Sequence, residues 1–240
     1  MEFRQFKSDM ELSVFEKNIG SMIINRVEKF SEKLAVHELH NDKFVRLKWS
    51  ELFNKIKSLA QGLIYLGLEK GDKVAALCND EIDVLAFELA CMSIGGIYVP
   101  LFSGYYPKQI EYVISHSDPR FVIVSDDNQL EKILSTMATG SIEKYFMLDY
   151  PDKYLESSRI FDFSLLYNNN NESLFFERLE DVKSEDICLL IYTSGGTTGI
   201  SKGVPLTHKN VLGQQKALSQ VWNITEDDII LSYFPWHQSL

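Results

Sequence analysis

The chain is poor in the features that mark several classes of protein. It holds only three cysteines, Cys78, Cys91 and Cys188, which lie far apart among apolar neighbours, with no CxxC pair and no histidine at metal-ligand spacing. Such cysteines are typical of core packing in a reducing compartment, which disfavours a disulfide scaffold or a metal site. No run approaches the roughly 18 to 20 apolar residues that span a bilayer. Residues 1–18 lack the apolar stretch of a signal peptide, so we expect a cytoplasmic protein.

An excess of positive charge is also missing. The formal net charge is −10, and acids and bases are interspersed along the sequence. This balance argues against a surface for polyanions, so we expect no nucleic-acid partner, although a local basic pocket for a nucleotide stays compatible with it. With 45% hydrophobic residues, the 240-residue chain can bury a large core.

Strand-like and helix-like segments alternate along the chain. This pattern predicts an α/β fold with a mainly parallel sheet and helices on both faces. We expect helices over 19–30, 52–66, 82–94, 107–116 and 128–138, and strands over 34–39, 44–49, 73–78, 97–100, 121–125, 145–148 and 187–192. The first two strands should form a hairpin, and Gly67 should cap the helix before it. Between Tyr150 and Ser184 the pattern weakens, and we interpret Asn168 to Asn171 as a solvated loop.

A glycine-rich segment directly follows the strand at 187–192. It reads Thr193, Ser194, Gly195, Gly196, Thr197, Thr198, Gly199, Ile200, Ser201, Lys202, Gly203. The glycines allow backbone N–H groups to approach a ligand, the hydroxyls add neutral donors, and Lys202 adds a positive charge. A flexible linker needs neither a buried strand before it nor a lysine. The pattern therefore indicates a site for a polyphosphate.

Two common nucleotide-binding loops do not fit this segment. The Walker A loop needs a lysine between glycine and serine or threonine, whereas Lys202 lies between Ser201 and Gly203. The glycines also lack the GxGxxG spacing of dinucleotide-binding proteins.

The segment from Ile191 to His208 resembles the signature loop of the adenylate-forming enzymes, which include acyl-CoA synthetases, firefly-type luciferases and adenylation domains of peptide synthetases. Three further segments resemble other motifs of that family in the same order: Leu47 to Leu52, Ser93 to Pro100, and Ser232 to His237. The stretch from Tyr98 to Arg120, which includes Tyr112 and His116, looks more like long-chain acyl-CoA synthetases than like amino-acid adenylating domains. The resemblance implies the N-terminal portion of an acyl-CoA synthetase-like large domain.

The resemblance also implies roles for single residues. Thr193, Ser194, Gly195, Gly196, Thr197, Thr198, Gly199 and Lys202 would hold the β- and γ-phosphates of ATP, with Mg²⁺ spanning phosphate oxygens. Lys202 and His237 would be catalytic, and Trp236 and His237 would bind the substrate. By contrast, we interpret His208 as a first-turn helix residue, and Trp49 and Tyr98 as packing residues.

The implied reaction has two steps. A carboxylate, most readily a fatty acid, attacks the α-phosphorus of ATP to give an acyl-adenylate and pyrophosphate, and the thiol of CoA then displaces AMP. An aryl acid or a carrier-protein-bound product stays open, as does peripheral membrane association. The acyl chain length and the oligomeric state are not indicated. A kinase, a dehydrogenase or a non-catalytic nucleotide-binding fragment are the alternatives.

The chain also departs from the family. It stops at Leu240, before the family's later elements, so we expect a fragment that is inactive without the C-terminal portion of the same enzyme. Residues 1–70 would contribute to a second subdomain, 71–222 would form the α/β subdomain with the phosphate loop, and 223–240 would begin the next subdomain. Gly195 and Ser201 replace a usual hydroxyl residue and a usual proline, and the second change should loosen the loop.

Overall fold

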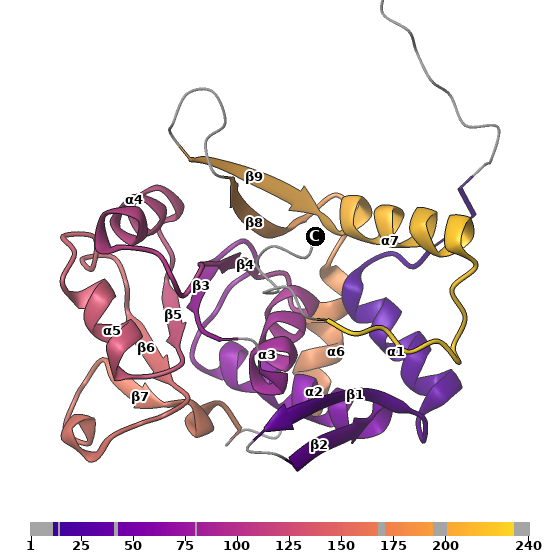
Figure 1. Cartoon of the computed structure of the whole chain (residues 1–240), viewed down its shortest axis with the longest axis horizontal. Coiled ribbons are helices and arrows are strands. Elements are labelled where there is room, and N and C mark those ends of the chain that lie inside the picture. Colours follow the sequence, from indigo (N-terminus) through magenta and orange to yellow (C-terminus); the bar gives the residue numbers. More distant parts are fainter. Residues whose placement is uncertain are drawn as a thin grey trace, which may run out of the picture.

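The computed structural model describes residues 12–13, 15–40, 43–79, 81–167, 171–193 and 201–232. Within these ranges a two-stranded sheet is formed by β1 (Leu34–His40) and β2 (Lys43–Lys48). A larger sheet contains β3 (Lys73–Leu77), β4 (Ile97–Pro100), β5 (Phe121–Val124), β6 (Lys144–Met147), β7 (Ile160–Asp162), β8 (Ile187–Thr193) and β9 (Lys202–Thr207). Its order is β7-β6-β5-β3-β4-β8-β9 (Figure 1). All neighbours are parallel except β8 and β9. The predicted α/β fold with a mainly parallel sheet is thus confirmed.

Helices cover both faces of the larger sheet. They are α1 (Ile19–Phe30), α2 (Trp49–Tyr65), α3 (Ile82–Ser93), α4 (Pro107–Ser117), α5 (Asp127–Leu134), α6 (Glu172–Asp181) and α7 (His208–Trp222), with short 3₁₀ turns η1 (Asp152–Tyr154) and η2 (Phe163–Tyr167). One core cluster joins the sheet to α1, α2, α3 and α6, and the other joins it to α4 and α5. Along β3, Val74 and Ala76 belong to the first cluster, whereas Ala75 and Leu77 belong to the second. This alternation explains why the strand is apolar throughout.

The hairpin and the first long helix follow the sequence closely. β1 and β2 pair antiparallel, as predicted. Trp49 was assigned to the second strand, but it is the first residue of α2. The Glu51 side chain accepts a hydrogen bond from the backbone N–H of Lys48 at 2.8 Å, which favours the start of a helix at this point. At the other end, Gly67 takes a φ of +88°, which glycine adopts without strain, and the helix ends as predicted.

Two elements were missed between Tyr150 and Ser184. The strand β7 and the helix α6 both lie in this interval. Asn171, which we interpreted as part of a solvated loop, is the N-cap of α6, and its side chain accepts from the backbone N–H of Leu174 at 3.4 Å. Residues 168–170 of that polar run lie outside the described residues.

The helix predicted over 128–138 is shorter than expected. α5 ends at Leu134, because the hydroxyls of Ser135 and Thr136 donate back to the carbonyls of Lys132 and Ile133, at 2.8 and 2.7 Å. Hydroxyl side chains that bond to the preceding turn compete with continuation of a helix.

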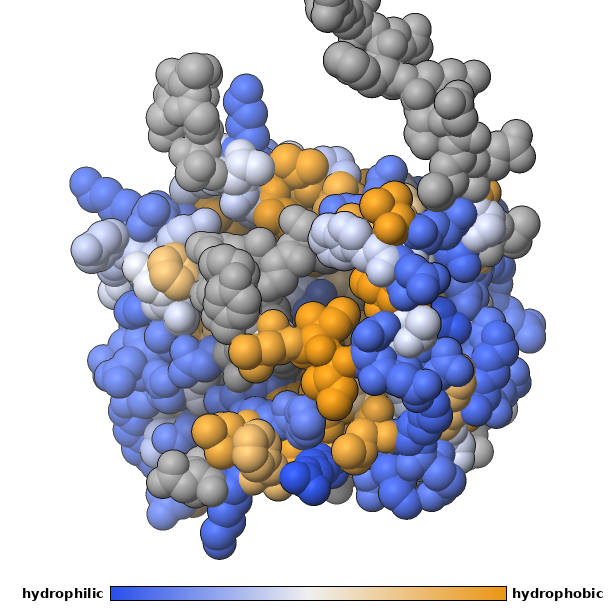
Figure 2. All heavy atoms as spheres, turned by 45° about the vertical axis from the view of Figure 1, so that its right-hand side comes forward, coloured by the Kyte–Doolittle hydropathy of each residue, from blue (hydrophilic) through white to orange (hydrophobic). Residues whose placement is uncertain are grey.

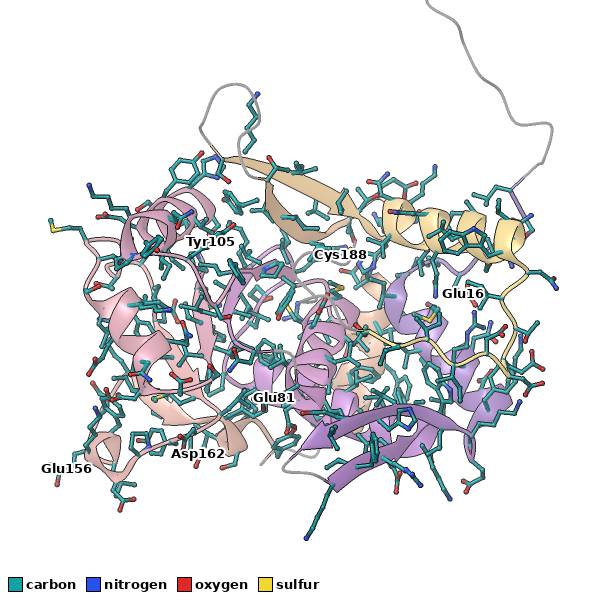
Figure 3. The ribbon with its side chains drawn as sticks, viewed as in Figure 1. Glu16, Glu81, Tyr105, Glu156, Asp162 and Cys188 are labelled. Carbon is teal, nitrogen blue, oxygen red and sulfur yellow. The ribbon has the colours of Figure 1, made fainter. Side chains whose placement is uncertain are left out.

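The cysteines pack as the sequence predicts. Cys91 and Cys188 are buried, Cys78 is half-buried, and all three are free thiols. Cys188, labelled in Figure 3, lies on β8 among the side chains of the first core cluster. Burial raises the pKa of the Cys188 thiol to about 12, so it stays protonated and unreactive.

One face of the protein carries a patch of apolar side chains framed by polar ones (Figure 2). Large exposed apolar side chains also mark the end of α7 and the segment after it: Val221, Trp222, Ile229, Ile230 and Leu231. Residues 223–232 form no helix or strand. Exposed apolar surface of this kind is typical of regions that another part of a protein or a partner covers. In the described part of the chain, no helix combines the length and the apolar character needed to cross a membrane.

Candidate functional site

The predicted phosphate-binding segment begins at the carboxyl end of β8. β4 and β8 are aligned at Tyr98 and Leu189; β4 ends two residues later at Pro100, whereas β8 continues four residues to Thr193. At about 3.3 Å per residue, β8 therefore extends about 7 Å beyond its parallel neighbour. Ligands of open α/β sheets bind outside the carboxyl ends of the strands, so the end of β8 is at the expected edge.

β9 returns alongside β8 and completes a two-stranded ribbon. The antiparallel register pairs Thr193 with Lys202 and Tyr192 with Gly203. We expected no strand after 187–192, so β9 is a strand that the sequence did not predict. Because side chains alternate along a strand, Thr193 and Lys202 project from the face of the ribbon opposite to Tyr192 and Gly203.

The two residues at the tip of this ribbon are both exposed to solvent, and both were predicted to bind phosphate. Among the described residues, Lys202 forms no salt bridge, so no described carboxylate neutralises its ammonium. The Ser201 hydroxyl donates to the Thr193 carbonyl and links the two strands at the point where the described part of the ribbon ends. A hydroxyl residue and a free ammonium held side by side are suited to a polyanion.

Several predicted site residues cannot be placed. Ser194, Gly195, Gly196, Thr197, Thr198, Gly199, Trp236 and His237 lie outside the described residues. Their assignments to phosphate or substrate therefore stay predictions. Of the predicted set, the structure brings Thr193 and Lys202 together.

Helix α4 lies beside the tip of the ribbon (Figure 1). The Tyr112 hydroxyl donates to the backbone carbonyl of Ser201 at 2.7 Å, and Nδ1 of His116 lies 2.6 Å from the Tyr192 hydroxyl. The rings of Tyr112 and His116 stack with centroids 5.8 Å apart, and both meet the ring of Tyr192 edge-on. We call Tyr112, His116 and Tyr192 the aromatic support. Its members contact both strands of the ribbon.

Gly203 makes room for the aromatic support. A Cβ atom at this position would lie 3.2 Å from Cδ1 of Leu190 and 3.3 Å from Cζ of Tyr192, which is tighter than an ordinary contact. The absence of a side chain at Gly203 lets the Tyr192 ring lie against the paired strand. Burial raises the pKa of the Tyr192 hydroxyl, so it stays protonated and can donate to Nδ1 of His116.

Neither Tyr112 nor His116 was predicted to be part of the site. The sequence did contain a signal, because they are four residues apart and therefore on one face of α4, while Ile110, Val113 and Ile114 are buried on another. Two aromatic rings at exposed positions on one face of a helix indicate that another helix or strand can pack against that face. The sequence gives no indication that this element is the ribbon.

His208 is a packing residue, as predicted. It is the first residue of α7, is fully buried, and accepts a hydrogen bond at Nδ1 from the backbone N–H of Ile19 at 3.2 Å. The pKa of His208 is lowered to about 4, chiefly by burial. The charge of Asp186 acts in the opposite direction, and the charge of Lys70 acts in the same direction as burial. A neutral side chain in the core, at the opposite end of β9 from Lys202, is not placed to bind phosphate.

A different nucleotide site could be expected elsewhere in this sheet. The strand order 4-3-5-6-7 has a switch point at β3 and β5, where flavodoxin-like proteins bind their ligand. Here Asp126, two residues after the end of β5, is the N-cap of α5. Its side chain accepts hydrogen bonds from the backbone N–H of Gln129 at 3.0 Å and from the Ser125 hydroxyl at 3.1 Å. The loop at this position carries no glycine-rich pattern, which leaves the ribbon as the candidate site.

The chain is similar to known proteins of one family. Among curated proteins, the long-chain-fatty-acid–CoA ligase ACSBG2 of Homo sapiens is 26% identical over 213 residues, covering 87% of this chain and 32% of that protein. The chloroplastic long-chain-fatty-acid–[acyl-carrier-protein] ligase AEE15 of Arabidopsis thaliana is 24% identical over 253 residues, covering 99% of this chain and 35% of that protein. The chain thus spans about a third of the length of these relatives.

Solved structures share the fold. The long-chain-fatty-acid-CoA ligase FadD1 from Archaeoglobus fulgidus has a TM-score of 0.76 at 24% identity, covering 93% of this chain and 44% of that chain. An acyl-CoA synthetase from Brucella canis has a TM-score of 0.70 at 21% identity, covering 88% of this chain and 37% of that chain. Residues 24–239, which include the ribbon, match the family described as AMP-binding enzyme, and the chain belongs to that family.

Proposed function

We propose that the full-length protein activates a carboxylic acid with ATP. The carboxylate attacks the α-phosphorus, the bond to the β-phosphate breaks, and acyl-adenylate and pyrophosphate result. A thiol then attacks the acyl carbon and releases AMP. The observation that carries the proposal is the pairing of Thr193 with Lys202 at the exposed end of β8 and β9, within the segment that matches the family.

The residues of the ribbon would act on the leaving group. Negative charge moves onto the pyrophosphate as it departs, and a fixed ammonium at Lys202 together with hydroxyl and backbone donors between Thr193 and Gly199 would stabilise that charge. ATP would bind as its Mg²⁺ complex, in which the metal neutralises part of the phosphate charge. We further propose that His237 lies near the reacting carboxylate and that Trp236 contributes to substrate binding.

A long-chain fatty acid is the proposed substrate, and CoA is the proposed acceptor. The support is the similarity to the human relative, which is a long-chain-fatty-acid–CoA ligase. An acyl carrier protein is the second candidate acceptor, because the Arabidopsis relative is a long-chain-fatty-acid–[acyl-carrier-protein] ligase.

The rest of the protein is part of the same proposal. We propose that residues 1–70, 71–222 and 223–240 belong to three successive parts of the enzyme, and that a C-terminal portion completes the site. We also propose a cytoplasmic protein, which can associate peripherally with the membrane that supplies its lipid substrate.

Product analysis tests this function. The full-length protein is mixed with Mg-ATP, a long-chain fatty acid, and either CoA or an acyl carrier protein bearing its thiol. AMP and pyrophosphate are expected, in amounts that depend on the fatty acid, with the thioester found on one of the two acceptors. Formation of ADP, or of AMP without dependence on any carboxylic acid, would contradict the proposal.

A further inference from the structure

The tip of the β8–β9 ribbon lacks support from the rest of the sheet. β8 pairs with β4 at Leu189, and beyond the end of β4 its described pairing is with β9. An isolated pair of strands is marginally stable in water and needs a helix or a further strand against it. Some other element must therefore hold Thr193 and Lys202 in a defined position.

Helix α4 can supply that support because it is itself fixed. Ile110, Val113 and Ile114 are buried in the second core cluster, beneath the sheet face that contains Val99 and Val124. Its first residue, Pro107, suits the first helical turn, and Asp118 closes the helix in the left-handed conformation at φ +51°. Because the core holds α4 in place, a side chain on this helix can hold a neighbouring element in a fixed position.

The aromatic support connects this helix to both strands. Next to β9, the contact is the hydrogen bond from Tyr112 to the carbonyl of Ser201, the residue directly before the strand begins at Lys202. On β8, it is the contact of His116 with the Tyr192 hydroxyl, one residue before Thr193. Each of the two phosphate-binding candidates therefore follows directly after a residue that α4 holds.

The aromatic support lies behind the ribbon, away from the proposed ligand. Tyr192 and Gly203 face α4, whereas the alternation of side chains directs Thr193 and Lys202 to the opposite face. Tyr112 and His116 therefore do not touch the phosphates and act only through the ribbon. Ser201 adds a further link between the strands, since its hydroxyl donates to the Thr193 carbonyl.

We propose that Tyr112 and His116 are positioning residues, which fix the backbone next to Lys202 and Thr193 so that both are preorganised for the triphosphate. The inference rests on the proposed function, since it assigns the ribbon to ATP. Preorganised charge stabilises a leaving group without the cost of rearrangement during the reaction. Loss of one such contact lets the ammonium of Lys202 sample other positions and weakens binding.

Removal of a single hydroxyl tests the inference. In the full-length protein, Tyr112→Phe removes the hydrogen bond to Ser201 and keeps the ring stack. The dissociation constant for Mg-ATP should rise about fivefold, as expected for one neutral hydrogen bond. The KM for the fatty acid should stay unchanged. Tyr65→Phe is the matched control, because Tyr65 is 74% exposed at the end of α2, and it should change neither value.

Conservative replacement separates positioning from packing. His116→Asn retains an acceptor near the place of Nδ1 and should keep most of the affinity for Mg-ATP, whereas His116→Leu should lose it. Equal affinities of the two variants would contradict the role of His116.

A double variant tests whether Tyr112 acts through Lys202. Combining Tyr112→Phe with Lys202→Ala should add little to the effect of Lys202→Ala alone. A full multiplicative loss in the double variant would show that Tyr112 does not act through Lys202.

Hydrogen exchange tests the support without ATP. The amide of Lys202 should exchange several-fold faster in Tyr112→Phe than in the parent protein, with the core amides of β3 unchanged. Unchanged exchange at Lys202 would overturn the inference, whatever the activity. If the parent protein formed no AMP and bound no Mg-ATP, the proposed function would fail instead, and the exchange result would still decide whether α4 holds the ribbon.

Discussion

Thr193 and Lys202 are partners across β8 and β9, the last residue of one strand beside the first residue of the next. A hydroxyl and an ammonium nine positions apart in the sequence thereby share one face of a two-stranded ribbon. This pairing places Thr193 and Lys202, which flank the glycine-rich segment in sequence, side by side at the carboxyl edge of the sheet.

Gly62 in α2 should not tolerate alanine. A Cβ atom there would lie 2.0 Å from the backbone carbonyl oxygen of Leu166, which belongs to η2 and cannot rotate away. At an exposed helical position, replacing glycine by alanine stabilises a protein by about 1 kcal/mol. At Gly62 the clash should make the same replacement destabilising. We expect Gly62→Ala to reduce the free energy of unfolding by more than about 2 kcal/mol, measured by urea denaturation.

Gly213 in α7 is the matched control for that substitution. Its added Cβ would meet Cζ of Phe15 at 3.6 Å, an ordinary contact. Gly213→Ala should therefore stabilise the protein by about 0.5 to 1 kcal/mol. If Gly62→Ala stabilised the protein as Gly213→Ala should, the close contact of α2 with the Leu166 carbonyl would be wrong.

Asn18 should be essential for the junction of α1 and α6. Its side chain is buried; the carbonyl accepts from the backbone N–H of Ser21 at 2.8 Å, and the amide donates to the carbonyls of Leu179 and Val182 at 3.3 and 2.9 Å. Asn18→Ala removes the helix cap and leaves buried carbonyls without this donor. We expect a loss of about 2 to 4 kcal/mol in the free energy of unfolding.

Asn18→Ser provides the comparison for this prediction. Serine keeps an N-cap acceptor but cannot reach the two carbonyls, so the loss should be intermediate. A serine variant as stable as the parent protein would mean that the contacts with Leu179 and Val182 contribute little.

His208 should make stability depend on pH. Burial lowers its pKa from 6.5 to about 4, so between these values the unfolded chain binds a proton that the folded chain does not. Stability must therefore fall as the pH is lowered through this window, by at most about 3 kcal/mol from this residue. Urea denaturation at pH 7, 5.5 and 4.5 measures the effect.

The variant His208→Asn isolates this contribution. Its side-chain carbonyl can accept from the N–H of Ile19, as Nδ1 does in the parent protein, but it does not titrate. The fall in stability between pH 6.5 and 4.5 should be much smaller in this variant. An identical pH dependence of the two proteins would rule out His208 as its source.

The strongly periodic elements could be predicted from the sequence, and the weakly periodic ones could not. α1 matches the predicted range 19–30 because apolar residues recur at the helical period. β4 matches 97–100 because a short apolar run directly follows Gly95 and Gly96. β7 has three residues, too few for a period to be recognised. β9 was missed because Pro205 lies within it; in this edge strand, paired with Leu190 of β8, proline costs no hydrogen bond on the open side.

The candidate site could be predicted only as a list of residues. The glycines, hydroxyls and Lys202 are adjacent in sequence, so composition and the preceding strand were enough to indicate phosphate. The aromatic support could not be found this way, because Tyr112 is 89 positions from Ser201 and their contact depends on how far β8 extends past β4. Contacts between distant segments require the topology of the sheet.

The most direct test of the account is the rate of pyrophosphate release by the full-length protein with Lys202→Ala, measured with saturating fatty acid and Mg-ATP. We predict a fall of about 100-fold or more, as for the loss of one preorganised donor to a developing charge, and a larger fall when Thr198→Ala is added. Lys209→Ala, at an exposed lysine of α7, should retain the parent rate. An unchanged rate in Lys202→Ala would contradict the assignment of the ribbon to the phosphates of ATP.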